Sequence, residues 1–127
     1  MVCGIGCDIA KVSRFARWLD RPGMVERFFN ERELFPRKDA SPARLMEWYA
    51  ARFAAKEAFS KALGTGFSDF KLADIYIEKN CDGQPFLRVT GGAREKLEDL
   101  CGRDAQVHVS LSHEKEYAVA FVIIERR

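Results

Sequence analysis

The charged side chains best suited to chemistry lie in two segments that are far apart in the sequence. Glu57 and Lys61 are four residues apart, so on a helix they would be neighbours one turn apart. Asp8 lies near the start of the chain, in a segment with glycines at positions 4 and 6. A Glu–Lys pair at this spacing is more often an ordinary surface ion pair, worth about 0.2–0.5 kcal/mol, than part of a ligand site. Both interpretations stay open at this point.

The segment that must position Glu57 and Lys61 is a long helix expected over residues 41–66. Ser41 can cap its first free N–H groups, Pro42 suits the first helical position, and Gly64 ends it. Apolar side chains occur nearly all the way round, and such a helix is usually buried. Its charges therefore need partners, and a ligand is one candidate. The apolar positions are Leu45, Trp48, Tyr49, Phe53, Ala55, Ala58, Phe59 and Ala62, and the charged ones are Arg52, Lys56, Glu57 and Lys61.

The segment that must position Asp8 is a strand expected over Val2 to Ile9. Its alternation places Asp8 on the same face as Gly4 and Gly6, a face that the two glycines leave open. A glycine inside a strand often marks the close approach of another backbone or of a ligand. A lone carboxylate at a strand end is more often a cap or turn residue, so Asp8 alone indicates little.

A short helix capped by Ser13 is expected after this strand. Arg14, Arg17 and Arg21 follow at steps of three and four, which predicts one outer face. Most charge runs of this kind are solvated surface, and the functional alternative is a docking surface for an acidic partner. The inner side of this helix is expected to hold Phe15, Trp18 and Leu19.

The remaining elements alternate between helical and strand patterns. Asn30 to Glu33 is typical of a capped helical turn. Asp82-Gly83 predicts a hairpin between two segments with period two, and two further strands close the chain. The expected elements are strands over 75–79 and 86–89, a helix over 91–100 with Ala93, Leu97, Leu100 and Cys101 on one side, and strands over 105–112 and 117–125.

Composition limits the class of protein. The chain has 127 residues, 47% of them hydrophobic, which fits one globular domain over 1–127. No apolar run is long enough for a membrane span, and no signal peptide precedes the first strand. The formal net charge of +2 is too small to indicate nucleic-acid binding. Four cysteines without a CxxC pair are expected to be buried, reduced thiols, which favours a cytoplasmic location over a disulfide or metal site.

Three sequence blocks resemble those of the holo-acyl-carrier-protein synthases, the small bacterial 4′-phosphopantetheinyl transferases. They are GIGCDIAKVSRF (4–15), RFAAKEAFSKALGTG (52–66) and LSHEKEYAVAFVI (111–123). They occur in that family's order and span nearly the whole chain. A shorter block, Asp82-Gly83-Gln84-Pro85, is similar to the loop that the family has between two strands. The resemblance implies an α+β fold, with a long central helix packed on a small, mainly antiparallel sheet. It also implies homotrimers with active sites between subunits.

The resemblance implies a magnesium-dependent transferase of fatty acid biosynthesis. Such enzymes move 4′-phosphopantetheine from coenzyme A to a serine of apo acyl carrier protein and release adenosine 3′,5′-bisphosphate. The residues matching Asp8 and Glu57 hold the metal with the coenzyme A pyrophosphate in that family. Mg²⁺ prefers carboxylate, phosphate and water oxygens and typically takes one or two protein carboxylates. It can offset the charge that develops on the displaced phosphate.

The other site residues follow from the same blocks. Lys61 is expected to reach the phosphates as a point charge and to assist catalysis. Arg52 and His113 match residues near the 3′-phosphate of coenzyme A. The loop after the helix, made of Gly64, Thr65 and Gly66, is expected to bring backbone N–H groups close to the ligand.

Arg14, Arg17 and Arg21 are the expected docking residues for the acidic carrier protein. One alternative is a non-catalytic basic module that uses these arginines to bind an acidic protein or nucleic acid, although the chain has no nucleic-acid motif. Another is a metal-dependent phosphotransferase that acts on some other nucleotide.

Overall fold

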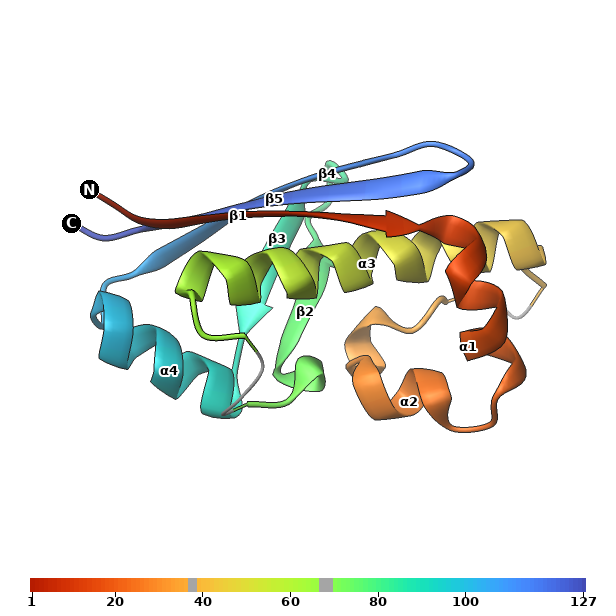
Figure 1. The fold of residues 1–127 in the computed structure, drawn as a ribbon, viewed down its shortest axis with the longest axis horizontal. Helices are drawn as coiled ribbons and strands as arrows, with labels where there is room; N and C mark the ends of the chain where they lie inside the picture. The colour runs from red at the N-terminus through yellow and green to blue at the C-terminus, as the bar shows by residue number, and fades with distance from the viewer. Residues whose placement is uncertain (37–38, 67–69) are drawn as a thin grey trace.

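The computed structural model describes residues 1–36, 39–66 and 70–127 and shows an α+β arrangement (Figure 1). Three antiparallel strands form one sheet in the order β1-β5-β4, and a hairpin of β2 and β3 lies beside it. Helix α3 runs along one face of the sheet, as expected for the long central helix (Figure 1). The bounds are β1 Val2–Lys11, η1 Val12–Phe15, α1 Ala16–Asp20, α2 Met24–Phe28, η2 Glu31–Glu33, α3 Pro42–Leu63, η3 Leu72–Asp74, β2 Ile75–Lys79, β3 Pro85–Val89, α4 Gly91–Cys101, β4 Gln106–His113 and β5 Tyr117–Glu125.

Helix α3 begins and ends where its sequence predicts. The Ser41 hydroxyl accepts from the Arg44 N–H, Pro42 is the first residue, and Gly64 adopts the left-handed conformation that ends the helix. The middle of the helix, from Tyr49 to Phe59, is buried on nearly every side. The sheet covers one side of the helix, and the loops and the hairpin cover the rest. The apolar side chains all the way round the helix are therefore buried.

Two glycines let β1 lie directly against α3. A Cβ on Gly4 would come 2.0 Å from the Ala62 carbonyl oxygen, and one on Gly6 would come 1.9 Å from the Ala58 carbonyl oxygen. Real side chains never occupy such positions, so the close backbone approach expected from these glycines is confirmed. Asp8 follows on the same face of the strand, at the side of α3.

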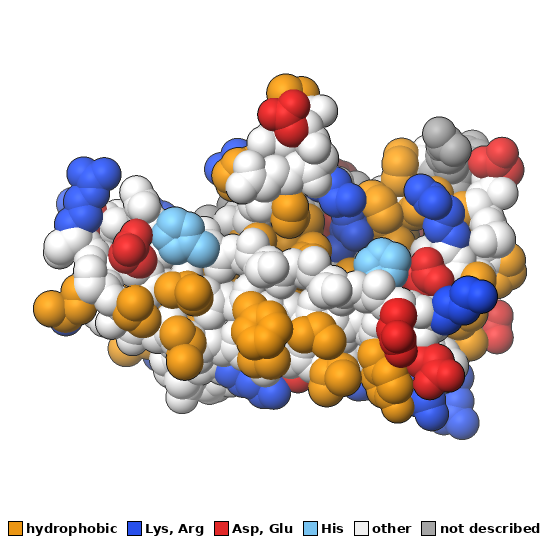
Figure 2. Space-filling model, turned by 90° about the horizontal axis from the view of Figure 1, so that it is seen from above, with side chains coloured by type: hydrophobic (Ala, Val, Ile, Leu, Met, Phe, Trp, Pro, Cys, Tyr) orange, Lys and Arg blue, Asp and Glu red, His pale blue; other side chains and the backbone are white. Residues whose placement is uncertain are grey.

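The opposite face of the sheet is bare, and it is apolar along β1 and β5, whereas β4 presents polar side chains there. Strand β5 alternates between side chains buried under α3 and side chains exposed on the other face. Figure 2 views the molecule from the side of the sheet and shows hydrophobic side chains gathered in a band along it. An exposed apolar area of this kind usually marks an interaction surface. The large hydrophobic side chains exposed on this face come from β1 and β5 and are Ile5, Ile9, Tyr117, Phe121 and Ile123.

Three details differ from the sequence-based expectations. Ser13 does not cap the first helix, because the chain enters a 3-10 turn one residue earlier, at Val12. Leu100 is 44% exposed, since it lies at the side of α4, and only the other three positions of its predicted inner face are buried. The cysteines are free, but only Cys101 is buried; Cys7 lies on the bare sheet face and Cys81 lies in the hairpin turn, both exposed.

No helix in the described ranges is both long enough and apolar enough to cross a membrane.

Candidate active site

Asp8, Glu57 and Lys61 come together beside α3. The Lys61 Nζ donates to Asp8 Oδ1 at 2.9 Å and to the Cys7 carbonyl oxygen at 3.1 Å. Lys61 is half exposed, whereas the Asp8 carboxylate is largely covered. Glu57 and Lys61 are therefore not a simple surface ion pair, because Lys61 takes its hydrogen-bonded partner, Asp8, from strand β1.

The Asp8 carboxylate changes the pKa of both of its neighbours, Glu57 and Lys61. Burial raises the pKa of Glu57 above its ordinary value, and the nearby Asp8 carboxylate raises it further, while Lys61 and Arg14 lower it. The Asp8 carboxylate, as a hydrogen-bond acceptor and as a charge, raises the pKa of the Lys61 ammonium. Two carboxylates that repel each other next to a flexible cation form a place where a divalent ion would be favoured.

This donor set fits a magnesium ion that takes further ligands from its substrate. The described part of the chain contains no group of three or more histidine, cysteine or acidic side chains that could hold a metal by themselves. Mg²⁺ usually keeps several waters and takes one or two carboxylates together with substrate phosphates. Asp8 and Glu57 supply that number, and Lys61 lies beside them with its side chain half exposed.

The loop after α3 is only partly available to a ligand. Gly64 and Gly66 have φ angles of 81° and 67°, a conformation that favours glycine. However, the Gly64 N–H donates to the carbonyl oxygens of Ser60 and Lys61 and so completes the helix end. The Gly64 N–H is therefore occupied within the helix end and is not available to a phosphate.

Arg52 and His113, which are distant in sequence, line one pocket. This pocket has a volume of about 340 Å³ and lies between α3, the β2–β3 hairpin and β4. Three cations and one carboxylate, Glu47, line it, and one large aromatic ring forms part of its wall. The excess of positive charge beside an aromatic ring suits a phosphorylated aromatic ligand. Its lining includes Arg44, Trp48, Arg52, Lys79, Leu111 and His113.

The Asp8 cluster and the Arg52 pocket lie on opposite sides of α3. Asp8 pairs with Ala120 of the central strand, and Ala120 pairs with Leu111 of the far strand, which lines the pocket. Ala120 is fully buried under α3. The helix therefore separates the two groups of ligand-binding candidates within one copy of the chain.

The three arginines of the expected docking surface are exposed but do not share one helical face. Arg14 is in η1, Arg17 is in α1, and Arg21 follows the end of α1 in extended conformation. The break between the 3-10 turn and α1 disrupts the spacing. The Arg14 guanidinium lies 5.1 Å from the Phe53 ring centroid, near Glu57, so it belongs to the edge of the carboxylate cluster. Arg21 lies at a separate groove with Trp18 and Leu19.

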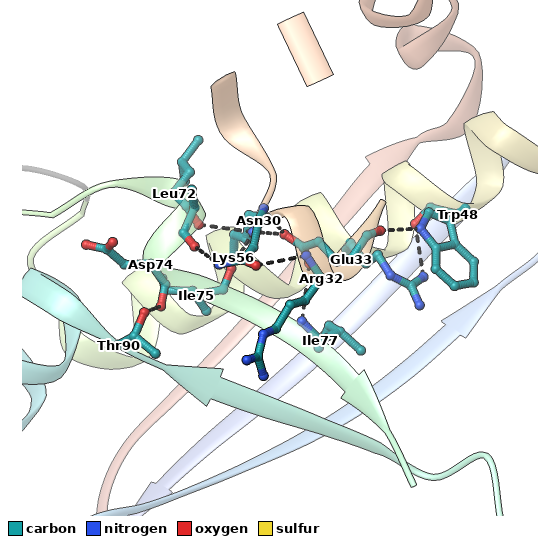
Figure 3. Close-up of polar contacts among 12 residues, drawn as sticks. Asn30, Arg32, Glu33, Trp48, Lys56, Leu72, Asp74, Ile75, Ile77 and Thr90 are labelled. Atoms are coloured by element: carbon teal, nitrogen blue, oxygen red, sulfur yellow. Dashed lines mark hydrogen bonds and ion pairs between the residues drawn. The ribbon is translucent and has the colours of Figure 1, made fainter. Parts of the chain in front are cut away.

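Lys56 has an internal partner, which the sequence alone did not identify. Its Nζ donates to the Glu33 carboxylate and to the carbonyl oxygens of Leu72 and Ile75, and both charged side chains are almost completely buried (Figure 3). Glu33 also accepts from the Ile77 N–H at 3.2 Å. This buried pair joins η2, α3 and β2. It therefore holds the hairpin wall of the pocket against the helix.

Other members of the pocket were also not foreseen. Arg44, Lys79 and Trp48 line it. The spacing of Trp48 and Arg52, one helical turn apart, was a possible indication. Lys79 lies on another element, and no local pattern connects it with the helix.

Comparisons with known proteins identify the family. The model of the 4′-phosphopantetheinyl transferase superfamily matches residues 4–122. A holo-[acyl-carrier-protein] synthase of Treponema denticola is 45% identical, over 98% of this chain and 99% of that protein. The one from Methylobacterium radiotolerans is 46% identical, over 98% and 94%.

Solved structures agree with these matches. The Bacillus anthracis holo-(acyl-carrier-protein) synthase, in complex with CoA (3′,5′-ADP), superimposes with a TM-score of 0.81 and 38% identity, over 100% of this chain and 99% of that one. The Neisseria meningitidis enzyme has a TM-score of 0.84 and 31% identity, over 99% and 100%. On this evidence the chain belongs to the 4′-phosphopantetheinyl transferase superfamily.

Proposed function

We propose that this protein is a holo-[acyl-carrier-protein] synthase. It transfers 4′-phosphopantetheine from coenzyme A to a serine of apo acyl carrier protein, and gives holo carrier protein and adenosine 3′,5′-bisphosphate for fatty acid biosynthesis. The observation that carries this proposal is the meeting of Asp8, Glu57 and Lys61 beside α3, in a chain whose relatives bear that enzyme's name. The family match over residues 4–122 supports one catalytic domain over 1–127.

In this proposal Asp8 and Glu57 would hold Mg²⁺ together with the pyrophosphate of coenzyme A. The ion would supply positive charge that stabilises the phosphate being displaced. The Lys61 ammonium already lies 2.9 Å from Asp8, and the side chain is half exposed, so it can turn toward a phosphate oxygen while remaining close to the carboxylate. The serine oxygen forms a bond to the β-phosphorus, and the bond from that phosphorus to the bridging oxygen breaks. The bridging oxygen leaves as part of adenosine 3′,5′-bisphosphate, and the serine proton passes to solvent water.

The Arg52 pocket is the proposed site of the 3′-phosphoadenosine end. Arg52, Lys79 and His113 supply cations or hydrogen-bond donors, and the Trp48 ring supplies an apolar wall. Charge-assisted hydrogen bonds from guanidinium groups suit phosphate oxygens. Thr65 and Gly66 are placed with the pyrophosphate, at the end of the helix that carries Lys61.

A homotrimer is the proposed assembly, because two features of the single chain are incomplete without a second copy. The apolar sheet face carries side chains such as Ile5, which is 70% exposed. The carboxylate cluster and the Arg52 pocket lie on opposite sides of α3. Packing of copies through the bare face would bury the apolar side chains and bring the cluster of one copy toward the pocket of another.

Arg14, Arg17 and Arg21 are proposed to guide the acidic carrier protein. Arg14, at the edge of the carboxylate cluster, would be near the acceptor serine, and Arg21 would contact the carrier further away. The cysteines include no CxxC pair, as is common for proteins of reducing compartments, and we place the enzyme in the cytoplasm.

Mass spectrometry of apo acyl carrier protein tests the proposal. The carrier is incubated with this protein, coenzyme A and Mg²⁺, and a gain corresponding to one phosphopantetheine group on the serine is expected. A matched reaction with a Ser→Ala carrier should show no gain. An unmodified carrier, with the protein folded and coenzyme A intact, would contradict the proposal.

A further inference from the structure

Arg52 is held against Trp48 in an unusual environment for a cation. Its guanidinium carbon lies 3.2 Å from the centroid of the Trp48 ring, and its Nη1 donates to the Trp48 carbonyl oxygen at 3.3 Å. The whole Arg52 residue is only 4% exposed. Its Nε is buried and has no hydrogen-bond partner in the described residues. Arg52, which lines the pocket, therefore keeps a buried N–H that no described residue satisfies.

The Trp48 ring is itself fixed from three directions. Its Nε1 donates to the Glu33 carbonyl oxygen at 2.7 Å (Figure 3). The Phe35 ring meets it nearly edge-on, with centroids 4.8 Å apart and an angle of 79° between the planes. The Lys79 ammonium lies 5.9 Å from its centroid. The indole thus joins two pocket cations that come from different elements.

The hydrogen bond to Glu33 connects this ring to the buried ion pair. Glu33 is anchored by Lys56 and by the Ile77 N–H, so its carbonyl oxygen belongs to a rigid part of the core (Figure 3). A ring held by that carbonyl offers the guanidinium a fixed plane on which to stack. Stacking on an aromatic face restricts the motion of an arginine guanidinium before any ligand is bound. The guanidinium then loses less conformational entropy when it binds a phosphate.

We propose that Trp48 is a positioning residue that holds Arg52, and with it Lys79, for the phosphate group farthest from the reacting phosphorus. The proposal rests on the function given above, because that phosphate is the 3′-phosphate of coenzyme A. Trp48 contributes through the orientation of the two cations.

The test compares binding of two nucleotides, adenosine 3′,5′-bisphosphate and adenosine 5′-monophosphate, which differ by the 3′-phosphate. Dissociation constants are measured by calorimetry for the unaltered protein, Trp48→Leu, Trp48→Phe, Arg52→Ala and the double variant Trp48→Leu/Arg52→Ala. Trp18→Phe, which changes the other tryptophan outside the pocket, is the matched control.

Trp48→Leu should weaken binding of the bisphosphate by about tenfold and change binding of the monophosphate less than about twofold. Trp48→Phe keeps a ring under the guanidinium and should restore most of the difference. The double variant should be little worse than Arg52→Ala, because the two residues act as a unit. In turnover, KM for coenzyme A should rise and kcat should change little.

If Trp48→Leu weakened the binding of both nucleotides equally, the ring would only fill space and the proposal would be overturned. Full additivity in the double variant would do the same. If Trp48→Leu does not fold, Trp48→Met replaces it and the same outcomes apply. Failure of the unaltered protein to prefer the bisphosphate would instead count against the proposed coenzyme A site, so the two failures are distinguishable.

Discussion

The ammonium of Lys61 lies 2.9 Å from the Asp8 carboxylate, across the contact between the long helix and the first strand. Residues 53 positions apart thus form one charged cluster, with Glu57 one turn before Lys61 on the same helix. This cluster leads to the first two predictions.

Asp8→Asn or Glu57→Gln should reduce turnover by at least about 100-fold, because each removes a proposed ligand of a metal that contributes several kcal/mol to the transition state. Circular dichroism and melting should show an intact fold, since both substitutions keep the shape of the side chain. Asp82→Asn, in the hairpin turn, is the control. Full activity of either variant at limiting Mg²⁺ would exclude the proposed metal site.

The metal-free Glu57→Gln protein should be more stable than the unaltered one at neutral pH. The pKa of Glu57 is raised in the folded protein, so the folded state holds its proton more tightly than the unfolded state does. Stability is therefore lost as the pH rises from the ordinary glutamate pKa through the raised one, and glutamine avoids this loss. The melting temperature should rise by on the order of 2 °C at pH 7, and the difference should disappear below the ordinary pKa. A melting difference that does not depend on pH would contradict this explanation.

Lys56→Met should destabilise the fold by about 3–5 kcal/mol, because it leaves the Glu33 charge buried without its cation. The double variant Glu33→Leu/Lys56→Met should recover part of this loss. Urea unfolding measures both variants. A single variant as stable as the unaltered protein would show that the pair contributes little to folding.

Arg21→Glu should raise KM for the carrier protein by about tenfold and leave KM for coenzyme A nearly unchanged, because Arg21 lies away from the coenzyme pocket. Salt should mimic this effect in the unaltered enzyme, since it screens charges over about 8–10 Å. Arg14→Glu should also affect Mg²⁺ dependence, because Arg14 lies near Glu57. Equal increases in both KM values for Arg21→Glu would indicate that Arg21 is ordinary surface.

Ile5→Lys should disrupt the proposed homotrimer and abolish activity. Ile5 pairs directly with Ile123 on the bare sheet face, and both are exposed in the single chain. A buried lysine there would oppose association. Sedimentation should show trimers for the unaltered protein and monomers for the variant. A fully active monomer would contradict a site between subunits.

The sequence predicted those elements whose causes are local. Ser41, Pro42 and Gly64 define the ends of α3. Gly4 and Gly6 correctly indicated a close backbone approach, which places Asp8 beside the helix.

Features that depend on packing between distant elements were not predictable in this way. The Glu33–Lys56 pair joins a short polar turn to a buried helix, and each residue alone looks like surface charge. Arg17 shows the reverse problem: its spacing from Arg14 fits one helix, but a 3-10 turn comes first and changes the direction of the side chains. Local spacing contains no information about these tertiary contacts.

The contact of Gly4 and Gly6 with the backbone of α3 separates the stability of the core from the spacing of the two carboxylates, Asp8 and Glu57. Because the strand rests on main-chain atoms, its height over the helix does not depend on the size of any side chain between them. Substitutions elsewhere in the core can therefore alter stability without altering the distance between Asp8 and Glu57.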